Sequence, residues 1–177
     1  MAIRQGEKGT SLEHALKDKR VLIVDDEPDI LETLEELLSM CRISRATRFD
    51  QARKELEKNG FDFAILDIKG VNGYEILRIA KRKKVPAVML TGYTISSQDP
   101  SIAYQEGADY YVPKEKMETI EGVLVDILKA RQRGTSPWES WKERFGAYFK
   151  SRYPPGSAIQ RQSTREQQAG KWEKYFY

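Results

Sequence analysis

The sequence predicts an α/β domain of the doubly wound class, in which helices cover both faces of a five-stranded parallel sheet. Short apolar runs rich in β-branched residues alternate with segments of helical periodicity from about residue 19 to residue 132. These runs are apolar throughout, which is typical of parallel strands buried on both faces. Elements that alternate in this way form right-handed β-α-β units, and so a single α/β domain is expected.

Five strands and five helices account for this region. The strands are expected at 20–25, 42–47, 61–66, 85–90 and 108–112, and the helices at 28–41, 49–60, 73–84, 97–107 and 114–132. Pro28 suits the first turn of its helix, where the missing N–H would have no partner. Asp50 is the expected N-cap of the second helix, and Gly60 is its expected end.

Composition divides the chain into three parts. Residues 1–18 are polar and are expected to form a flexible lead, residues 19–132 form the α/β domain, and residues 133–177 form a basic, aromatic helical tail. From Lys129 onward the chain holds eleven basic and four acidic residues, a balance of +7, whereas residues 1–128 carry −4 of the formal net charge of +3. This asymmetry indicates two parts with different tasks.

Several classes of protein and site are excluded by the composition. No apolar run approaches the length needed to span a bilayer, and the N-terminus lacks the apolar stretch of a secretory signal. We therefore expect a cytoplasmic protein without a membrane partner. Cys41 and His14 are the only residues of their types, which leaves little material for disulfides, a His/Cys zinc site or a Ser-His-Asp triad.

Polar residues follow the predicted strands at their carboxyl ends, where ligands bind in a doubly wound sheet. Asp25 and Asp26 follow the first strand, Asp67 the third, Thr91 the fourth and Lys114 the fifth. Clustered carboxylates bind a hard cation such as Mg²⁺, and a carboxylate can accept a phosphoryl group. A single Asp after a strand is more often a turn residue or a helix cap. Five such residues at corresponding strand ends favour a phosphoryl-transfer site instead.

The same stretch of sequence resembles a known family. The strings VLIVDDEPDILETLEELL, FDFAILD, GYEIL, VPAVMLTGY and EGADYYVPK are similar, in that order, to the CheY-like receiver domains of the response regulators of two-component signalling. The resemblance covers about residues 19–132 and implies the flavodoxin-like strand order 2-1-3-4-5. It implies a phosphorylated signalling module and not an enzyme, with a histidine kinase or phosphotransfer protein as the phosphoryl donor.

The resemblance also implies roles for individual residues. Asp67 would be the phosphoacceptor. Mg²⁺ would be held by Asp25, Asp26, Asp67 and the backbone carbonyl of Lys69. The phosphate contacts and switch residues would be Thr91, Gly92, Lys114 and Tyr111.

The loop after the expected phosphoacceptor departs from the family pattern. The segment LDIKGVNG reaches Gly73 in six residues, where the family usually has eight, and the usual proline is absent. Gly70, Asn72 and Gly73 can support a tighter turn. Since the loop lacks none of the acids, we expect a receiver that is still phosphorylated.

The tail carries large aromatic residues at near-helical spacing. Residues 136–139 form a capping-box pattern with Pro137 at the first helical position. The rings that follow are Trp138, Trp141, Phe145, Tyr148 and Phe149, and a second short helix would carry Trp172, Tyr175 and Phe176.

Three interpretations of this tail stay open. Its helices fold back on the receiver or on each other, or they form a surface for a downstream protein or for self-association, or they bind nucleic acid. An aromatic stripe beside a face of mixed charge favours docking onto protein, so a nucleic-acid partner is not expected. Direct binding of nucleic acid by the basic tail remains the alternative function.

Overall fold

Five parallel strands form one sheet, as the sequence predicts. The computed structural model describes residues 14–92 and 100–152. The strands are β1 (Arg20–Val24), β2 (Arg42–Ala46), β3 (Phe63–Asp67), β4 (Ala87–Thr91) and β5 (Tyr110–Pro113). Their order across the sheet is β2-β1-β3-β4-β5, and every neighbouring pair is parallel. The predicted fold class and strand order are confirmed.

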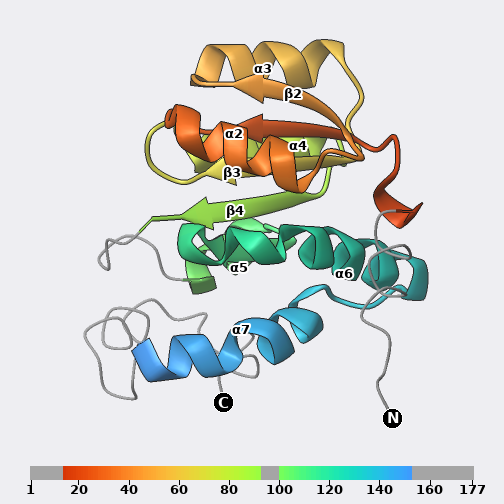
Figure 1. Ribbon diagram of the computed structural model, residues 1–177, viewed down its shortest axis with the longest axis vertical. Coiled ribbons are helices and arrows are strands. Elements are labelled where there is room, and N and C mark those ends of the chain that lie inside the picture. Colours follow the sequence, from red (N-terminus) through yellow and green to blue (C-terminus); the bar gives the residue numbers. More distant parts are fainter. Residues whose placement is uncertain (1–13, 93–99, 153–177) are drawn as a thin grey trace.

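Helices follow the strands in sequence and cover the sheet (Figure 1). They are α2 (Pro28–Leu37), α3 (Phe49–Lys58), α4 (Gly73–Arg82), α5 (Pro100–Glu106), the 3₁₀ helix η1 (Lys114–Thr119), α6 (Ile120–Arg133) and α7 (Trp138–Arg152). Figure 1 shows α7 beyond α5 and α6, at the end of the molecule opposite β2. No helix in the described ranges has both the length and the hydropathy needed to cross a membrane.

Local predictions at the starts of α3 and of the helix after β5 were wrong. The N-cap of α3 is Arg48 and not Asp50, because Phe49 packs against the core and begins the helix one residue before that aspartate. The helix expected at 114–132 begins as η1, in which Lys116 has a non-helical φ of −118°. Regular α-helix starts only at Ile120. The irregular turn of η1 therefore separates β5 from α6, and Lys114 is its first residue.

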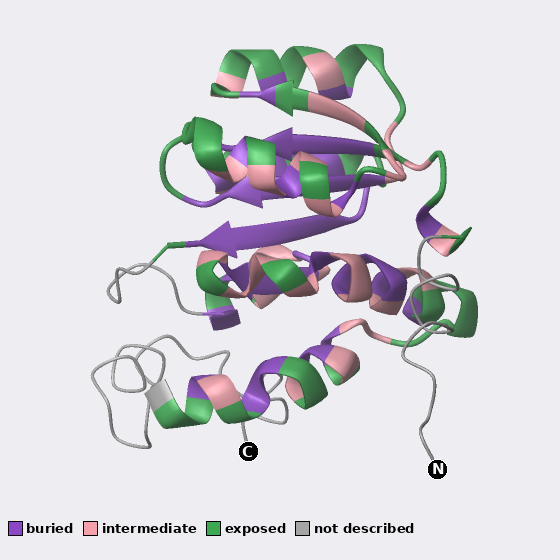
Figure 2. Ribbon diagram, viewed as in Figure 1, coloured by how far each residue is buried: buried purple, intermediate pink, exposed green. Residues whose placement is uncertain are grey.

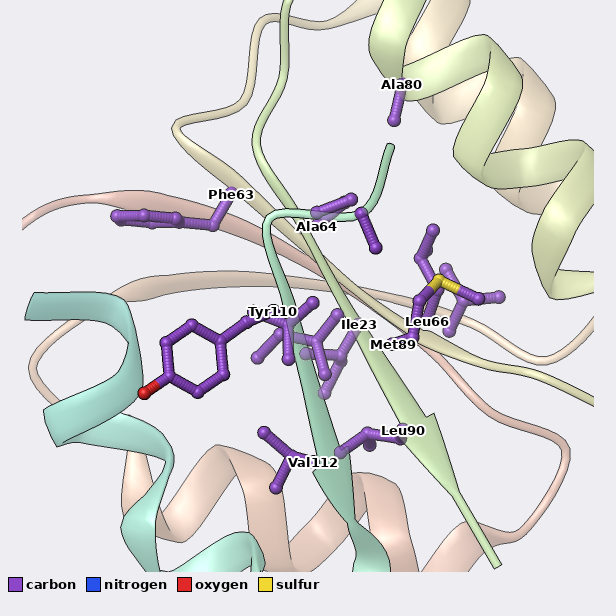
Figure 3. Close-up of a cluster of buried hydrophobic side chains, with 14 of the residues drawn as sticks. Ile23, Phe63, Ala64, Leu66, Ala80, Met89, Leu90, Tyr110 and Val112 are labelled. Atoms are coloured by element: carbon purple, nitrogen blue, oxygen red, sulfur yellow. The ribbon is translucent and has the colours of Figure 1, made fainter. Parts of the chain in front are cut away.

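The core consists of strand side chains packed against the apolar faces of the helices. Figure 3 shows Ile23, Phe63, Leu66, Met89 and Val112 in one cluster, and each has no solvent exposure. Fully burying an aliphatic or aromatic side chain contributes roughly 1.5–3 kcal/mol. This packing fixes the positions of the strand ends, on which the polar residues of interest lie.

The packed unit extends past residues 19–132 at both ends. Leu16 is fully buried, and the thiol of Cys41 donates a hydrogen bond to its carbonyl at 3.4 Å. At the other end, buried positions alternate with exposed ones along α7 (Figure 2), and the buried ones are Trp138, Trp141, Phe145 and Phe149. Buried side chains thus continue from the α/β domain into Leu16 and α7, while the domain boundaries at residues 19 and 133 stay a prediction. The remaining lead, residues 1–13, and the second tail helix lie outside the described residues.

Candidate functional site at the carboxyl edge of the sheet

The polar residues that the sequence singles out lie along one edge of the sheet. Asp25 directly follows β1, Asp67 and Thr91 end β3 and β4, and Lys114 directly follows β5. The register places these ends side by side, since Val24 pairs with Leu66, Asp67 with Leu90 and Thr91 with Pro113. Strand geometry thus brings side chains from distant parts of the sequence to a common edge.

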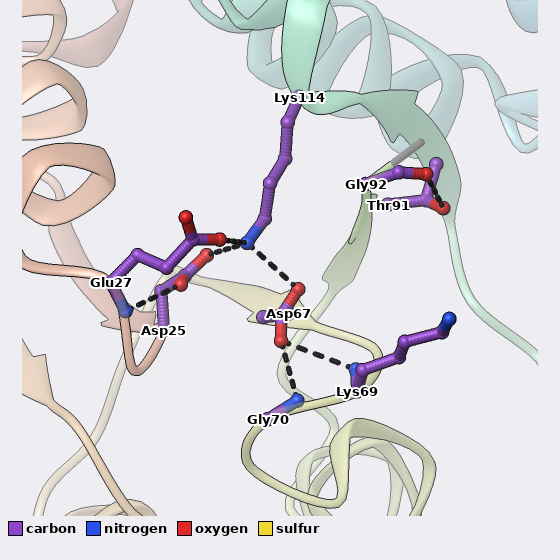
Figure 4. A network of polar contacts seen from close by, with 8 residues as sticks. All are labelled: Asp25, Glu27, Asp67, Lys69, Gly70, Thr91, Gly92 and Lys114. Atoms are coloured by element: carbon purple, nitrogen blue, oxygen red, sulfur yellow. Dashed lines mark hydrogen bonds and ion pairs between the residues drawn. The ribbon is translucent and has the colours of Figure 1, made fainter. Parts of the chain in front are cut away.

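The ammonium of Lys114 is the centre of the cluster (Figure 4). Its Nζ atom lies 2.8 Å from Oδ2 of Asp25, 3.0 Å from Oδ1 of Asp67 and 2.7 Å from Oε1 of Glu27. The side chain is 13% exposed. Burial alone would lower the pKa of Lys114, but its hydrogen bonds to the three carboxylates outweigh burial and raise that pKa. The residue therefore supplies a permanent positive charge beside Asp67.

The carboxylate of Asp67 has a fixed orientation. Its Oδ2 atom accepts hydrogen bonds from the backbone N–H groups of Gly70, at 2.8 Å, and Lys69, at 3.2 Å. Its Oδ1 atom faces Lys114, and the residue as a whole is 4% exposed. Because each oxygen has its own partners, the group is held in one orientation at the end of β3.

Asp25 is less well satisfied than Asp67. Burial raises the pKa of Asp25, the negative charge of Asp67 raises it further, and the hydrogen bonds from Lys114 and from the N–H of Glu27 oppose this rise only in part. Among the described residues, the contact with the ammonium of Lys114 is the one that its buried Oδ2 atom makes, and no other donor reaches this atom. An additional cation would therefore relieve an unfavourable charge at this position.

Three carboxylates at this edge could hold a metal ion. Asp25, Asp26 and Asp67 each offer one oxygen, and these oxygens lie within 4.8 Å of one another. Asp26 is exposed, so one side of the cluster faces solvent. Oxygen donors, a poorly satisfied Asp25 and an open side together fit Mg²⁺, which keeps part of its water shell when bound to protein. The backbone N–H of Lys69 contacts Asp67, while ligation by its carbonyl stays a prediction.

The shortened loop after β3 folds as a tight turn that depends on glycine. A Cβ atom on Gly70 would lie 2.0 Å from Oδ1 of Asp26, and one on Gly73 would lie 2.0 Å from the backbone oxygen of Asp67. Between them, Asn72 takes a left-handed φ of 56°, and the N–H of Gly73 bonds the carbonyl of Ile68 at 3.2 Å. The loop is therefore shorter without displacing the acids from the cluster.

The expected switch residues Thr91 and Tyr111 make contacts with groups outside the carboxylate cluster. The hydroxyl of Thr91 donates to the carbonyl of Gly92 at 3.1 Å, and Figure 4 shows both residues at the end of β4, to one side of the contact between Asp67 and Lys114. Tyr111 is 1% exposed, and its ring centroid lies 5.8 Å from that of Phe149 on α7. Tyr111 thus packs against the tail helix.

Comparison with known proteins agrees with this geometry. The model of the response regulator receiver domain family matches residues 21–124, more than half of the chain. The chain belongs to the response regulator receiver family. It is therefore a receiver domain of two-component signalling, as the resemblance implied.

Relatives match the receiver over part of their own length. The two-component response regulator ARR18 of Arabidopsis thaliana is 29% identical over 62% of this chain but only 18% of that protein. The response regulator GtcR of Aneurinibacillus migulanus is 32% identical over 63% of this chain and 49% of its own length. The chain thus spans less than half of the length of either relative.

Solved structures share the fold. A CheY-like receiver protein from Methanospirillum hungatei is 27% identical, with a TM-score of 0.53 over 64% of this chain and 98% of its own. A response regulator from Burkholderia pseudomallei, crystallised with a phosphorylated aspartic acid, a calcium ion and citrate, is 25% identical, with a TM-score of 0.55 over 66% and 73% of the two chains.

Sequence reasoning gave no role to Glu27 in this receiver. Glu27 is the N-cap residue of α2, where its side chain makes no capping bond and contacts Lys114 instead. The signal was available in the sequence, since three consecutive acids follow β1. Only the fold shows that the third of them reaches a lysine 87 residues further along the chain.

Proposed function

We propose that this receiver accepts a phosphoryl group on Asp67 from a histidine kinase or phosphotransfer protein, and that the modification switches a protein-binding surface. The observation that carries the proposal is the carboxylate of Asp67, oriented by two backbone N–H groups and lying 3.0 Å from Lys114. A fixed carboxylate beside a fixed positive charge suits attack on a phosphorus atom.

The proposed reaction transfers one phosphoryl group. An oxygen of Asp67 forms a bond to phosphorus, the bond from phosphorus to the donor histidine nitrogen breaks, and the imidazole keeps the electron pair and takes a proton from water. The product is an acyl phosphate on Asp67. Lys114, already paired with that carboxylate, offsets the negative charge of the phosphoryl oxygens.

Mg²⁺ is the cofactor that these residues fit. Asp25, Asp26 and Asp67 would hold it, with the Lys69 carbonyl as a further ligand. When bound, it would supply further positive charge to the phosphoryl oxygens, in addition to that of Lys114. The phosphorylated aspartic acid and calcium ion named for the Burkholderia protein support this assignment by similarity.

The phosphoacceptor is tested by intact mass after incubation with acetyl phosphate and Mg²⁺. The wild-type protein should gain the mass of one phosphoryl group, Asp67→Asn should gain none, and omission of Mg²⁺ should prevent the reaction. Asp50→Asn, which changes an exposed aspartate on α3, is the matched control and should react like the wild type. An adduct of equal yield on Asp67→Asn would refute the assignment.

The readout through Thr91 and Tyr111 is part of the same proposal. A hydroxyl at the end of β4 can bond a phosphoryl oxygen and draw its loop toward Asp67. Thr91→Ala should therefore still gain the phosphoryl mass but should not alter the environment of Tyr111. A structure of the beryllofluoride complex in which Tyr111 keeps its present position would remove this mechanism.

Binding of nucleic acid by the tail is the competing function. Stacking on bases needs exposed rings. Four rings of α7 are instead buried against the receiver; they are Trp138, Trp141, Phe145 and Phe149. We therefore favour a protein partner. Salt-sensitive retention of the full-length protein on single-stranded DNA or RNA, lost when residues 133–177 are removed, would reverse this choice.

A further inference from the structure

The segment from Tyr111 to Glu115 connects the carboxylate cluster to α7. Within it, Lys114 contacts Asp25 and Asp67 in the cluster. Three residues before that lysine, the carbonyl of Tyr111 accepts a hydrogen bond of 2.7 Å from the indole N–H of Trp141. The residue after it, Glu115, accepts a hydrogen bond from the hydroxyl of Tyr148. One short piece of backbone thus carries contacts to both regions.

The docked position of α7 is specific. The indole N–H of Trp138 donates to the carbonyl of Ala108 at 2.8 Å. Arg144 pairs at 2.7 Å with Asp126 of α6, whose carboxylate also accepts a hydrogen bond from Tyr110 of β5. Polar contacts of this kind fix a helix in one orientation, whereas apolar burial alone would tolerate sliding.

Aromatic packing reinforces these contacts. The rings of Tyr111 and Phe149 lie 5.8 Å apart, and those of Trp141 and Phe149 lie 5.2 Å apart. Trp138 meets the ring of Tyr104 of α5 edge to face at 5.3 Å. The helix therefore covers α5, β5 and α6 together. In the described ranges, the only large hydrophobic side chain that stays exposed is Ile102, at 40%.

We propose that the docking of α7 and the state of Asp67 are coupled, so that α7 binds the unphosphorylated receiver and is released when Asp67 carries a phosphoryl group. The inference rests on the proposed function. Lys114 now lies among three carboxylates, and added phosphoryl charge on Asp67 draws its ammonium, and the backbone on either side, to a new position. The contacts of Tyr111 and Glu115 with α7 form around the present position and weaken when it changes.

Coupling of this kind has a measurable size and is reciprocal. Typical allosteric couplings change an affinity by about 5- to 150-fold, and the site must affect the helix as much as the helix affects the site. Release would uncover the apolar face of α5, β5 and α6 and the aromatic stripe of α7 at once. The modified receiver would thereby gain an interaction surface that the described residues of the resting state do not present.

Tryptophan fluorescence gives a direct readout. The chain has three tryptophans, and Trp172→Phe leaves only Trp138 and Trp141, which both belong to α7 and are buried where it packs on the receiver. In this full-length variant, acetyl phosphate and Mg²⁺ should shift the emission to longer wavelength, and adding Asp67→Asn should abolish the shift. Intact mass is measured on the same samples. A complete adduct with unchanged emission would overturn the coupling and leave the phosphoacceptor proposal standing.

A second arm needs no phosphorylation, so it decides the coupling even if no adduct forms. Lys114→Gln removes the ammonium that links the cluster to this backbone, and hydrogen exchange of the α7 amides should become at least about fivefold faster. Lys116→Gln, in the same 3₁₀ helix, changes a side chain that is 43% exposed; it is the matched control and should leave exchange unchanged. Equal exchange in the two folded variants would overturn the proposal.

The reciprocal variant covers the case in which Lys114→Gln fails to fold. Trp141→Phe keeps an aromatic ring but removes the N–H that bonds the carbonyl of Tyr111. Weaker docking should then raise the affinity for beryllofluoride with Mg²⁺ several-fold, as measured by calorimetry. An unchanged or lower affinity would contradict the proposed direction of coupling.

Discussion

The carboxylate cluster and the α7 interface meet at β5 but are built on opposite principles. The cluster holds Asp25 and Asp67 in buried positions, and their attraction to Lys114 competes with the cost of removing charge from water. The α7 interface buries large rings, and the indole N–H groups of Trp138 and Trp141 both have carbonyl acceptors. One region places reactive charge, whereas the other supplies stability.

This difference predicts opposite responses to substitution. Removing a ring from the interface leaves a cavity, and removing Trp138 or Trp141 also leaves an unpaired carbonyl, so every truncation there should destabilise the fold. Removing a carboxylate from the cluster relieves repulsion, so some substitutions there should stabilise the metal-free protein while they abolish its chemistry.

The largest effect is expected for Trp141→Ala. Trp141 is fully buried and bonds the carbonyl of Tyr111 at 2.7 Å. Its truncation should lower the free energy of unfolding by about 4 kcal/mol, measured by urea denaturation. Lys150→Ala changes an exposed position of the same helix, and its free energy of unfolding should stay within about 0.5 kcal/mol of the wild-type value. A loss below about 1 kcal/mol for Trp141→Ala would mean that α7 contributes little to the fold.

The loop of the cluster provides a second, matched pair of substitutions. Gly73→Ala places a Cβ against the backbone oxygen of Asp67 and should destabilise the protein by about 2 kcal/mol. Gly70→Ala places a Cβ against the exposed side chain of Asp26, which can turn away. The free energy of unfolding of this variant should therefore change by less than about 1 kcal/mol. The displaced carboxylate should nevertheless weaken Mg²⁺ binding in calorimetry. Equal losses of stability would contradict this account of the loop.

The sequence was sufficient for the sheet and for four members of the cluster. Apolar runs and helical periods located all five strands, and parallel strands necessarily end at a common edge. For this reason Asp25, Asp26, Asp67 and Lys114 could be grouped before any contact was known. The positions of Thr91 and Tyr111 relative to the cluster depend on loop and ring conformations, which a strand pattern does not determine.

The docking of α7 was beyond what the pattern could decide. Its aromatic stripe is compatible with folding back, with self-association and with a partner surface, because all three bury rings. The choice depends on acceptors for the two indole N–H groups, and these are backbone carbonyls of residues 108 and 111. The amino-acid sequence carries no direct signal for the direction of a carbonyl group. Glu27 was missed for a similar reason, since its contact with Lys114 is long-range.

A smaller effect, of opposite sign, is expected for Asp25→Asn. The raised pKa of Asp25 means that its contribution to stability is present at low pH and is lost as the pH rises from about 4 through that pKa. At neutral pH, with a chelator present, Asp25→Asn should therefore stabilise the protein by about 1 kcal/mol while Mg²⁺ binding falls. The variant should also lose part of the pH dependence of unfolding. Destabilisation would show that the pairing of Asp25 with Lys114 outweighs its burial.

The smallest effect is expected for Tyr148→Phe, at the point where the two regions meet. The substitution keeps the ring and removes only the hydroxyl that bonds Glu115, a partly solvated contact. We expect the free energy of unfolding, measured by urea denaturation, to fall by about 0.5 kcal/mol, because surface contacts to a carboxylate contribute little to stability. If Glu115 transmits the state of the cluster to α7, the double variant Tyr148→Phe with Lys114→Gln should be less destabilised than the sum of the two single variants. Strict additivity would assign the link to the carbonyl of Tyr111 alone, which Trp141 holds.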